Sequence, residues 1–233
     1  MFCFPYAGGG AAIFRSWATH LAVEADLTAV ELPGRGGRIK EPAFRSMAVL
    51  VQQIADAIAP HTTSEFAFFG HSMGAMIAFE LSRELRRRGL PGPRHLFVSG
   101  REAPQLPDTD PFTFNLPEPE FIKELHRLNG TPKEVLEHEE LMKLVIPLLR
   151  ADFELIQTYK YHNESPLPAP ISAYGGLEDH EVSRDRLMPW KDQTESAFSL
   201  HMLPGDHFFL RSAQSDLLGL ISGELRKNGR PGL

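Results

Sequence analysis

The sequence predicts an α/β protein in which a mostly parallel central sheet is flanked by helices on both faces. Short apolar runs alternate with stretches whose apolar residues recur at helical spacing, over most of the 233 residues. This alternation stops between residues 104 and 168 and then returns. We therefore expect one domain, residues 1–233, with a helical insertion at residues 104–168.

The first half of the chain supplies three strand–helix pairs. The expected strands are short, apolar runs at residues 2–4, 27–31 and 65–69. The expected helices carry apolar residues three or four positions apart, at residues 14–21, 50–58 and 75–88. Ser46 is the expected N-cap of the second helix.

The third strand runs directly into the most informative motif of the chain. Residues 66–74 read Phe-Ala-Phe-Phe-Gly-His-Ser-Met-Gly. A Gly-x-Ser-x-Gly pentapeptide between a buried strand and a helix is typical of a nucleophile elbow. The glycines allow a turn sharp enough to lift the serine hydroxyl clear of the sheet. We therefore predict that Ser72 is a catalytic nucleophile.

The second half contains the remaining strands and the insertion. Strands are expected at residues 94–98, 171–174 and 198–202, a closing helix at residues 217–225, and a frayed end at residues 228–233. Prolines break up the start of the insertion: Pro104, Pro107, Pro111, Pro117 and Pro119.

Two helices are expected within the insertion. Residues 131–134 read as a capping box with proline at the first helical position. Residues 139–161 form a longer amphipathic pattern that Pro147 should kink. A helical insertion between two strands of such a sheet is interpreted as a lid over an active site, with plain scaffold packing as the alternative.

A serine nucleophile needs a histidine base, which is held in turn by a carboxylate. In this topology the three follow in the order serine, acid, histidine. Of the ten histidines, His207 lies directly after the last predicted strand and before the last helix. His71, within the elbow, should point away from the hydroxyl. We therefore predict His207 as the base.

Asp179 is the predicted acid, because it follows the preceding strand and lies 28 residues before His207. Glu178 is adjacent and could take its place. Asp206 neighbours the histidine, but adjacent side chains usually diverge. Asp185 is interpreted as an N-cap.

The oxyanion formed on attack requires two preorganised N–H groups. One is expected from Met73, directly after the nucleophile. The other is expected from Ala7, in the loop Tyr6-Ala7-Gly8-Gly9-Gly10 that follows the first strand. A flexible turn is the alternative interpretation of the triple glycine.

Other classes of function find little support. A net charge of −6 argues against whole-molecule attraction to nucleic acid or an anionic membrane. The single cysteine, Cys3, lies in an apolar strand and is expected to be a buried thiol. Phosphate-loop, dinucleotide and zinc motifs are lacking, so neither cofactor nor metal is expected. With no long apolar run and no signal-type start, we expect a cytoplasmic protein, monomeric by default.

Five segments, in order along nearly the whole chain, resemble the type II thioesterases that accompany polyketide and nonribosomal peptide synthetases. They are residues 2–9, 31–38, 70–75, 174–179 and 205–210. The resemblance implies an α/β-hydrolase fold with a helical lid and a triad of Ser72, Asp179 and His207. It also implies hydrolysis of acyl or aminoacyl groups from the phosphopantetheine thiol of acyl or peptidyl carrier proteins, in an editing role.

Members of this family usually have a further stretch before the first strand, whereas this sequence starts on it. Either the sequence begins late or an edge strand is missing. The loop containing Arg35, Arg38 and Lys40 could meet an acidic carrier protein, or could be a solvated basic loop.

Three alternative functions stay open at this point. A carboxylesterase or lipase would use the same triad on oxygen esters, and a medium-chain fatty-acyl thioesterase would share both fold and triad. A non-catalytic α/β-hydrolase binding module would require a broken triad.

Overall fold

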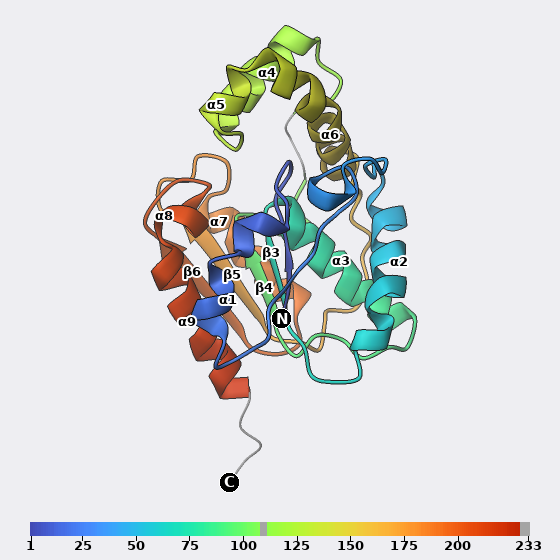
Figure 1. Cartoon of the computed structure of the whole chain (residues 1–233). Helices are drawn as coiled ribbons and strands as arrows, with labels where there is room; N and C mark the ends of the chain where they lie inside the picture. The colour runs from blue at the N-terminus through green and yellow to red at the C-terminus, as the bar shows by residue number, and fades with distance from the viewer. Residues whose placement is uncertain (108–110, 229–233) are drawn as a thin grey trace.

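A parallel sheet forms the centre of the molecule in the computed structural model, which describes residues 1–107 and 111–228 (Figure 1). The strands are β1 (Phe2–Phe4), β2 (Thr28–Ala29), β3 (Phe68–His71), β4 (Leu96–Ser99), β5 (Ile171–Gly176) and β6 (Phe198–Leu203). They form one six-stranded sheet in the order β2-β1-β3-β4-β5-β6, with every pairing parallel. The predicted fold class is therefore confirmed. All carboxyl ends meet at one edge, where polar residues from distant segments can converge.

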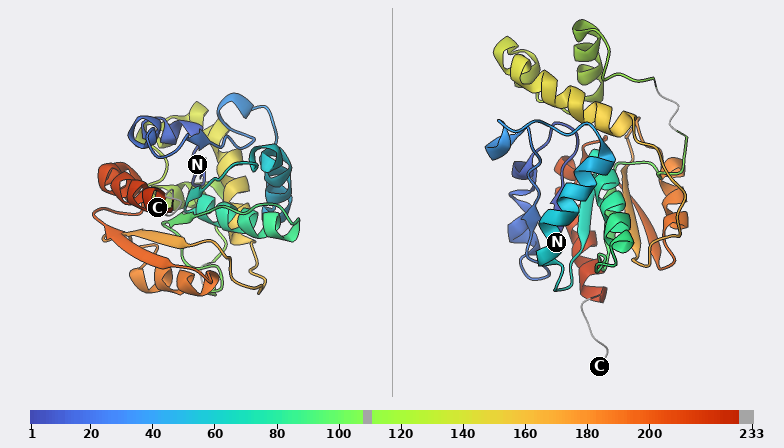
Figure 2. Two further views of the ribbon diagram at one scale, coloured as in Figure 1. Left: turned by 90° about the horizontal axis from the view of Figure 1, so that it is seen from below. Right: turned by 90° about the vertical axis from the view of Figure 1, so that its right-hand side faces the viewer.

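Helices cover both faces of the sheet (Figure 2). They are α1 (Trp17–Leu21), α2 (Met47–Ile58), α3 (Met73–Arg87), α7 (Arg184–Leu187), α8 (Phe209–Ser212) and α9 (Gln214–Asn228). Successive side chains of a strand point to opposite faces. Phe68 accordingly packs in the apolar cluster of α2 and α3, whereas Phe69 packs in the cluster of α1 and α9. Cys3 is fully buried, as predicted, and burial raises the pKa of its thiol to about 12.

Several predicted element bounds need correction. The strand expected at residues 27–31 is only Thr28–Ala29, because it pairs with β1 alone at the edge of the sheet. β3 starts later than expected and continues through His71, which pairs with Ser99 of β4. Ser46 occupies the N-cap position of α2, but its side chain makes no capping hydrogen bond. Residues 229–233, which belong to the expected frayed end, lie outside the described residues.

The described residues of the insertion form three helices, α4 (Glu118–Leu128), α5 (Lys133–Leu136) and α6 (Glu139–Gln157), which lie across the carboxyl end of the sheet (Figure 1). They share an apolar cluster of their own: Phe121, Leu125, Met142, Ile146 and Leu149. Helix α4 is not expected from the sequence, where the prolines suggest a broken chain. Pro117 is its N-cap and Pro119 lies in its first turn, where a missing N–H costs nothing.

The other two helices of the insertion differ in detail from the prediction. The predicted capping box is wrong, because Pro132 is the N-cap of α5 and no side chain caps the helix. Helix α6 ends at Gln157 and runs through Pro147 as one helix. Pro147 and the residue one turn before it, Lys143, are both exposed. Water can therefore satisfy the carbonyl that proline leaves without a partner.

Candidate active site

Ser72 is held in a strained backbone conformation at the turn between β3 and α3. Its φ of 53° and ψ of −114° are rare for a residue with a side chain, and such strain costs about 1–3 kcal/mol. The flanking glycines make this turn possible. A Cβ on Gly70 would lie 2.0 Å from the carbonyl oxygen of Gly74, and one on Gly74 would lie 2.1 Å from that of Phe4. Neither position has space for a side chain.

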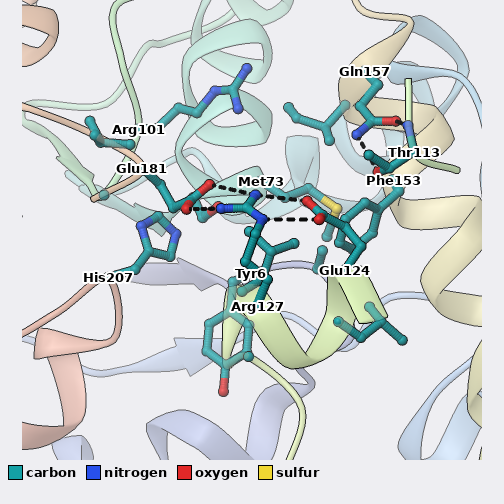
Figure 3. Close-up of a pocket in the computed structure, with 18 of the residues that line it drawn as sticks. Tyr6, Met73, Arg101, Thr113, Glu124, Arg127, Phe153, Gln157, Glu181 and His207 are labelled. Atoms are coloured by element: carbon teal, nitrogen blue, oxygen red, sulfur yellow. Dashed lines mark hydrogen bonds and ion pairs between the residues drawn. The ribbon is translucent and has the colours of Figure 1, made fainter. Parts of the chain in front are cut away.

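A cavity of about 730 Å³ opens above this turn. The residues from the sheet side include Ser72, Met73, Ala7 and His207. The opposite wall is formed by residues of the insertion, among them Leu125, Arg127, Leu149, Phe153 and Ile156. Figure 3 shows His207 on one side of this space and Phe153 and Gln157 on the other. The cavity therefore lies between the sheet and the insertion.

His207 and Asp179 form a hydrogen-bonded pair within this region. The distance from Nδ1 of His207 to Oδ2 of Asp179 is 2.8 Å, and the carboxylate is fully buried. The other oxygen, Oδ1, accepts hydrogen bonds from the N–H groups of Glu181 (2.8 Å) and Val182 (3.1 Å). Burial acts to raise the pKa of Asp179, but the bonds from His207 and the two N–H groups outweigh it, and the pKa is lowered.

This pairing has a direct chemical consequence for the imidazole. An ionised carboxylate only accepts hydrogen bonds, so Nδ1 of His207 must carry a proton and Nε2 is left as the basic nitrogen. Within the described residues no hydrogen bond joins this ring to the Ser72 hydroxyl, although both line the same cavity. Such bonds are often long before substrate binds, and shorten in the reacting complex.

The other carboxylates considered for this role lie elsewhere. Glu178 is exposed. Asp206 accepts a hydrogen bond from the N–H of Phe208 at 2.8 Å and serves the turn after β6. Asp185 lies in the first turn of α7, whose N-cap is Ser183, so its interpretation as an N-cap is wrong. The candidate pair is therefore His207 with Asp179.

The two residues predicted to donate to the oxyanion, Ala7 and Met73, both line the same cavity. Met73 is the first residue of α3, so its N–H has no partner within the helix. Ala7 lies in the loop after β1, where the N–H of Gly9 donates to the carbonyl of Tyr6 at 2.9 Å and closes a turn. In the part of the chain that the structure describes, neither N–H donates a hydrogen bond. Both are available to bind an anion.

His71 packs beneath His207 and away from solvent. The centroids of the two rings are 5.2 Å apart, and Nδ1 of His71 lies 2.9 Å from the Ser99 hydroxyl. Burial and the neighbouring imidazole hold the pKa of His71 well below its usual value, so this ring is neutral. A Cβ on Gly100 would lie 2.6 Å from the His71 ring, which explains the glycine there.

An ion-pair cluster in the cavity was missed by sequence reasoning. Arg127 of α4 contacts both carboxylate oxygens of Glu181, at 2.5 and 3.1 Å, and both of Glu124, at 2.7 and 2.9 Å (Figure 3). Glu181 belongs to the loop that presents Asp179. The cluster therefore connects the insertion to the sheet side across the cavity. A Glu–Arg pair three residues apart was the available signal, but α4 itself was not expected.

The basic loop considered for docking is only partly exposed. Arg35 is 5% exposed and bonded to Asp152 of α6, so it cannot meet a partner. Arg38 is paired with Glu41 at 2.5 Å. Lys40 remains exposed.

Among residues 1–107 and 111–228 there is no group of three or more His, Cys, Asp or Glu side chains placed to hold a metal ion. Over the same residues, no helix combines the length and the apolar character needed to cross a membrane.

The fold defines an α/β-hydrolase, with a serine at the turn between a central strand and the following helix. The family model described as "Thioesterase domain" matches residues 1–225, and the chain belongs to this thioesterase family. It is an enzyme that hydrolyses thioester bonds, and the resemblance to type II thioesterases is confirmed.

Three similar proteins illustrate the family. Linear gramicidin dehydrogenase LgrE of Brevibacillus parabrevis is 44% identical over 97% of this chain and 87% of its own length. RedJ, a thioesterase of the prodiginine pathway in Streptomyces coelicolor, is 36% identical over 96% of this chain and 84% of its own, with a TM-score of 0.89. BorB, a type II thioesterase from the borrelidin biosynthetic cluster, is 34% identical over 96% of this chain and 91% of its own, with a TM-score of 0.87.

Proposed function

We propose that the protein hydrolyses acyl or aminoacyl thioesters from the phosphopantetheine arm of carrier proteins, as an editing enzyme of polyketide or nonribosomal peptide synthesis. Membership of the thioesterase family supports the reaction, and similarity to proteins of such pathways supports the substrate class. The proposal depends on one observation: His207, hydrogen-bonded to Asp179, lines the same cavity as Ser72.

In the proposed mechanism, the Ser72 hydroxyl attacks the thioester carbonyl while Nε2 of His207 takes its proton. The carbonyl oxygen becomes an anion, which the N–H groups of Ala7 and Met73 bind. Asp179 holds the imidazole in the required tautomer and stabilises the imidazolium. The C–S bond then breaks, and His207 returns the proton to the departing thiol.

Water completes the second half of the reaction. His207 deprotonates a water molecule, which attacks the acyl ester on Ser72 and releases the carboxylic acid and the free serine. The chain itself supplies the nucleophile, the base and the oxyanion donors, so the proposed reaction uses no bound cofactor.

The insertion at residues 104–168 is proposed to act as a lid. Side chains of α4 and α6 form the wall opposite Ser72, and the ion pair between Arg127 and Glu181 connects this wall to the loop beside Asp179. A substrate on a long, thin arm can reach Ser72 between these walls, whereas a bulky one requires α4 to move.

The Ser72→Ala variant tests the function. We expect thioesterase activity to fall on the order of 10⁴-fold or more, because no other group replaces the nucleophile. Ser46→Ala is the matched control, since the Ser46 side chain makes no capping bond. Retention of most activity by Ser72→Ala would end the proposal.

A substrate panel separates this function from its alternatives. Acylated carrier proteins, acyl-CoA thioesters and p-nitrophenyl esters are compared as substrates by kcat/KM. Preference for carrier-bound short acyl or aminoacyl groups is expected, whereas preference for medium-chain acyl groups or for oxygen esters would favour the alternatives. Failure of a fluorophosphonate to label Ser72 would point to a non-catalytic binding module.

A further inference from the structure

Arg35 forms a buried ion pair that joins three separate segments of the chain. Its guanidinium contacts both oxygens of Asp152, with Nη2 at 2.7 Å from Oδ1 and Nη1 at 2.9 Å from Oδ2. The side chains are 5% and 2% exposed. Nη1 also donates to the carbonyl of Gly9 at 2.9 Å. The loop after β2, helix α6 and the loop after β1 therefore meet at this pair.

Asp152 contacts the loop after β1 directly. Its Oδ2 accepts a hydrogen bond of 2.7 Å from the N–H of Gly8, the residue that follows Ala7. A Cβ added to Gly8 would lie 2.5 Å from Cδ2 of Leu149, which is one turn before Asp152 on α6. Gly8 has a φ of +76°, which suits glycine alone. Helix α6 therefore holds the Gly8 peptide by a hydrogen bond and by close packing.

The energetics argue against stability as the main role of this pair. Burial acts to raise the pKa of Asp152, and the Arg35 guanidinium and the Gly8 N–H act against that shift. The attraction between two buried charges does little more than offset the cost of removing them from water. A protein with well-packed apolar residues of similar size in their place is often as stable or more so. What an apolar pair cannot provide is an acceptor for the Gly8 N–H and a donor for the Gly9 carbonyl.

We propose that the Arg35–Asp152 ion pair positions the oxyanion loop, residues 6–10, and so aims the Ala7 N–H at the developing oxyanion. Two backbone groups that follow Ala7, the N–H of Gly8 and the carbonyl of Gly9, are both held from outside the loop. Oxyanion donors act only when fixed in advance, and small displacements are costly. The inference rests on the proposed role of Ala7. Arg35 and Asp152 are thus positioning residues that touch no substrate.

The Arg35→Met/Asp152→Leu double variant tests this role, because it removes both charges and leaves apolar packing. Its matched control is Arg45→Gln/Glu154→Gln, which removes another ion pair between α6 and the sheet side without contact to the oxyanion loop. Steady-state hydrolysis of a hexanoyl-N-acetylcysteamine thioester is measured, together with inhibition by the corresponding trifluoromethyl ketone, whose adduct carries an oxyanion.

In the double variant we expect kcat to fall on the order of 10–100-fold, with KM changed less than about twofold. Affinity for the trifluoromethyl ketone should fall by a similar factor, and the control should stay within about twofold. Unchanged kcat in a folded double variant would overturn the inference, and so would a loss confined to KM.

If the double variant does not fold, Asp152→Asn and Arg35→Lys replace it. Each keeps its side chain's approximate size but cannot make all the hydrogen bonds of the original. We expect at least about a fivefold loss of kcat in both, and faster amide exchange in residues 6–10; a smaller loss in both overturns the inference. Loss of activity in Ser72→Ala beside normal kcat in these variants would refute the positioning role alone and leave the proposed function standing.

Discussion

The sheet and the insertion face each other across one cavity but are held together by different forces. β3, β4 and β5 are buried along their whole length, in apolar clusters on both faces of the sheet. The insertion has a small apolar cluster of its own, and charged pairs contribute to its attachment to the sheet side, including Arg127–Glu181 and Arg35–Asp152. The groups proposed for catalysis come from the tightly packed side.

From this difference we expect substitutions to have unequal effects in the two regions. Apolar burial stabilises by roughly 25 cal/mol per Å², so a sheet buried on both faces resists movement. Exposed ion pairs contribute at most about 1 kcal/mol each and are weakened by salt. We therefore expect large effects on the sheet side and small effects in the insertion, with the buried Arg35–Asp152 pair as the exception.

After Ser72→Ala, the largest expected effect on the sheet side comes from Asp179→Asn. The amide keeps the shape of the carboxylate but favours the wrong tautomer of His207, so kcat should fall on the order of 10³–10⁴-fold. Glu178→Gln is the matched control, because this neighbour is exposed and should leave kcat within about twofold. A comparable loss in the control, or little loss in Asp179→Asn, would contradict the assignment.

Gly74→Ala should destabilise the sheet side by about 3 kcal/mol or more, because overpacking against backbone cannot be relieved by a rotamer change. The added Cβ would lie 2.1 Å from the carbonyl oxygen of Phe4. In contrast, Gly219→Ala in α9 meets nothing within 4 Å and should stabilise by up to about 1 kcal/mol. Urea unfolding checks both, and equal midpoints would refute the packing argument.

Acid should lower the free energy of unfolding, because the sheet side contains buried histidines. Burial lowers the pKa of His95 to about 4 from 6.5, so the folded state resists protonation that the unfolded chain accepts. This contribution to stability is complete above pH 6.5 and is lost as the pH falls from 6.5 toward 4. By pH 5 the loss is about 2 kcal/mol. His71 acts in the same direction.

The free energy of unfolding measured between pH 7 and pH 5 tests this prediction. His95→Gln, which can still bond to the Ser172 hydroxyl, should flatten the dependence, whereas replacement of exposed His126 by Gln should not. An unchanged slope in His95→Gln would show that His95 is not responsible.

The smallest expected effect belongs to the insertion. Arg127→Met removes the ion pair that joins α4 to the loop beside Asp179. Because this pair restrains α4 only weakly, kcat/KM for a carrier-bound thioester should rise, but by less than about fivefold. The difference from wild type should shrink at high salt. Lys143→Met is the control, since among the described residues Lys143 pairs only with Glu139 and Glu140 of its own helix, α6. A loss above tenfold would mean that Arg127 does more than restrain α4.

The same two regions differ in how well the sequence predicts them. On the sheet side, strand and helix periodicity gave the fold class, and the elbow motif located the turn at Ser72. In the insertion, α4 was missed because Pro117 and Pro119 suggest a broken chain, although both are tolerated at a helix start. In such a small unit, the placement of the side chains depends more on partners that are distant in the sequence than on sequence neighbours.

The parallel α/β fold and the serine turn can be predicted from the sequence alone, because these depend on local periodicity and on the backbone freedom of glycine. Which charges become buried and paired depends on how the chain folds. Arg35 was considered only as part of a basic loop, and no sequence pattern singled out Asp152, a buried carboxylate among the apolar residues of α6. They are 117 residues apart, and the ion pair exists because folding brings α6 over the loop after β2. The energy of a charge depends on what covers it, and only the folded chain specifies that.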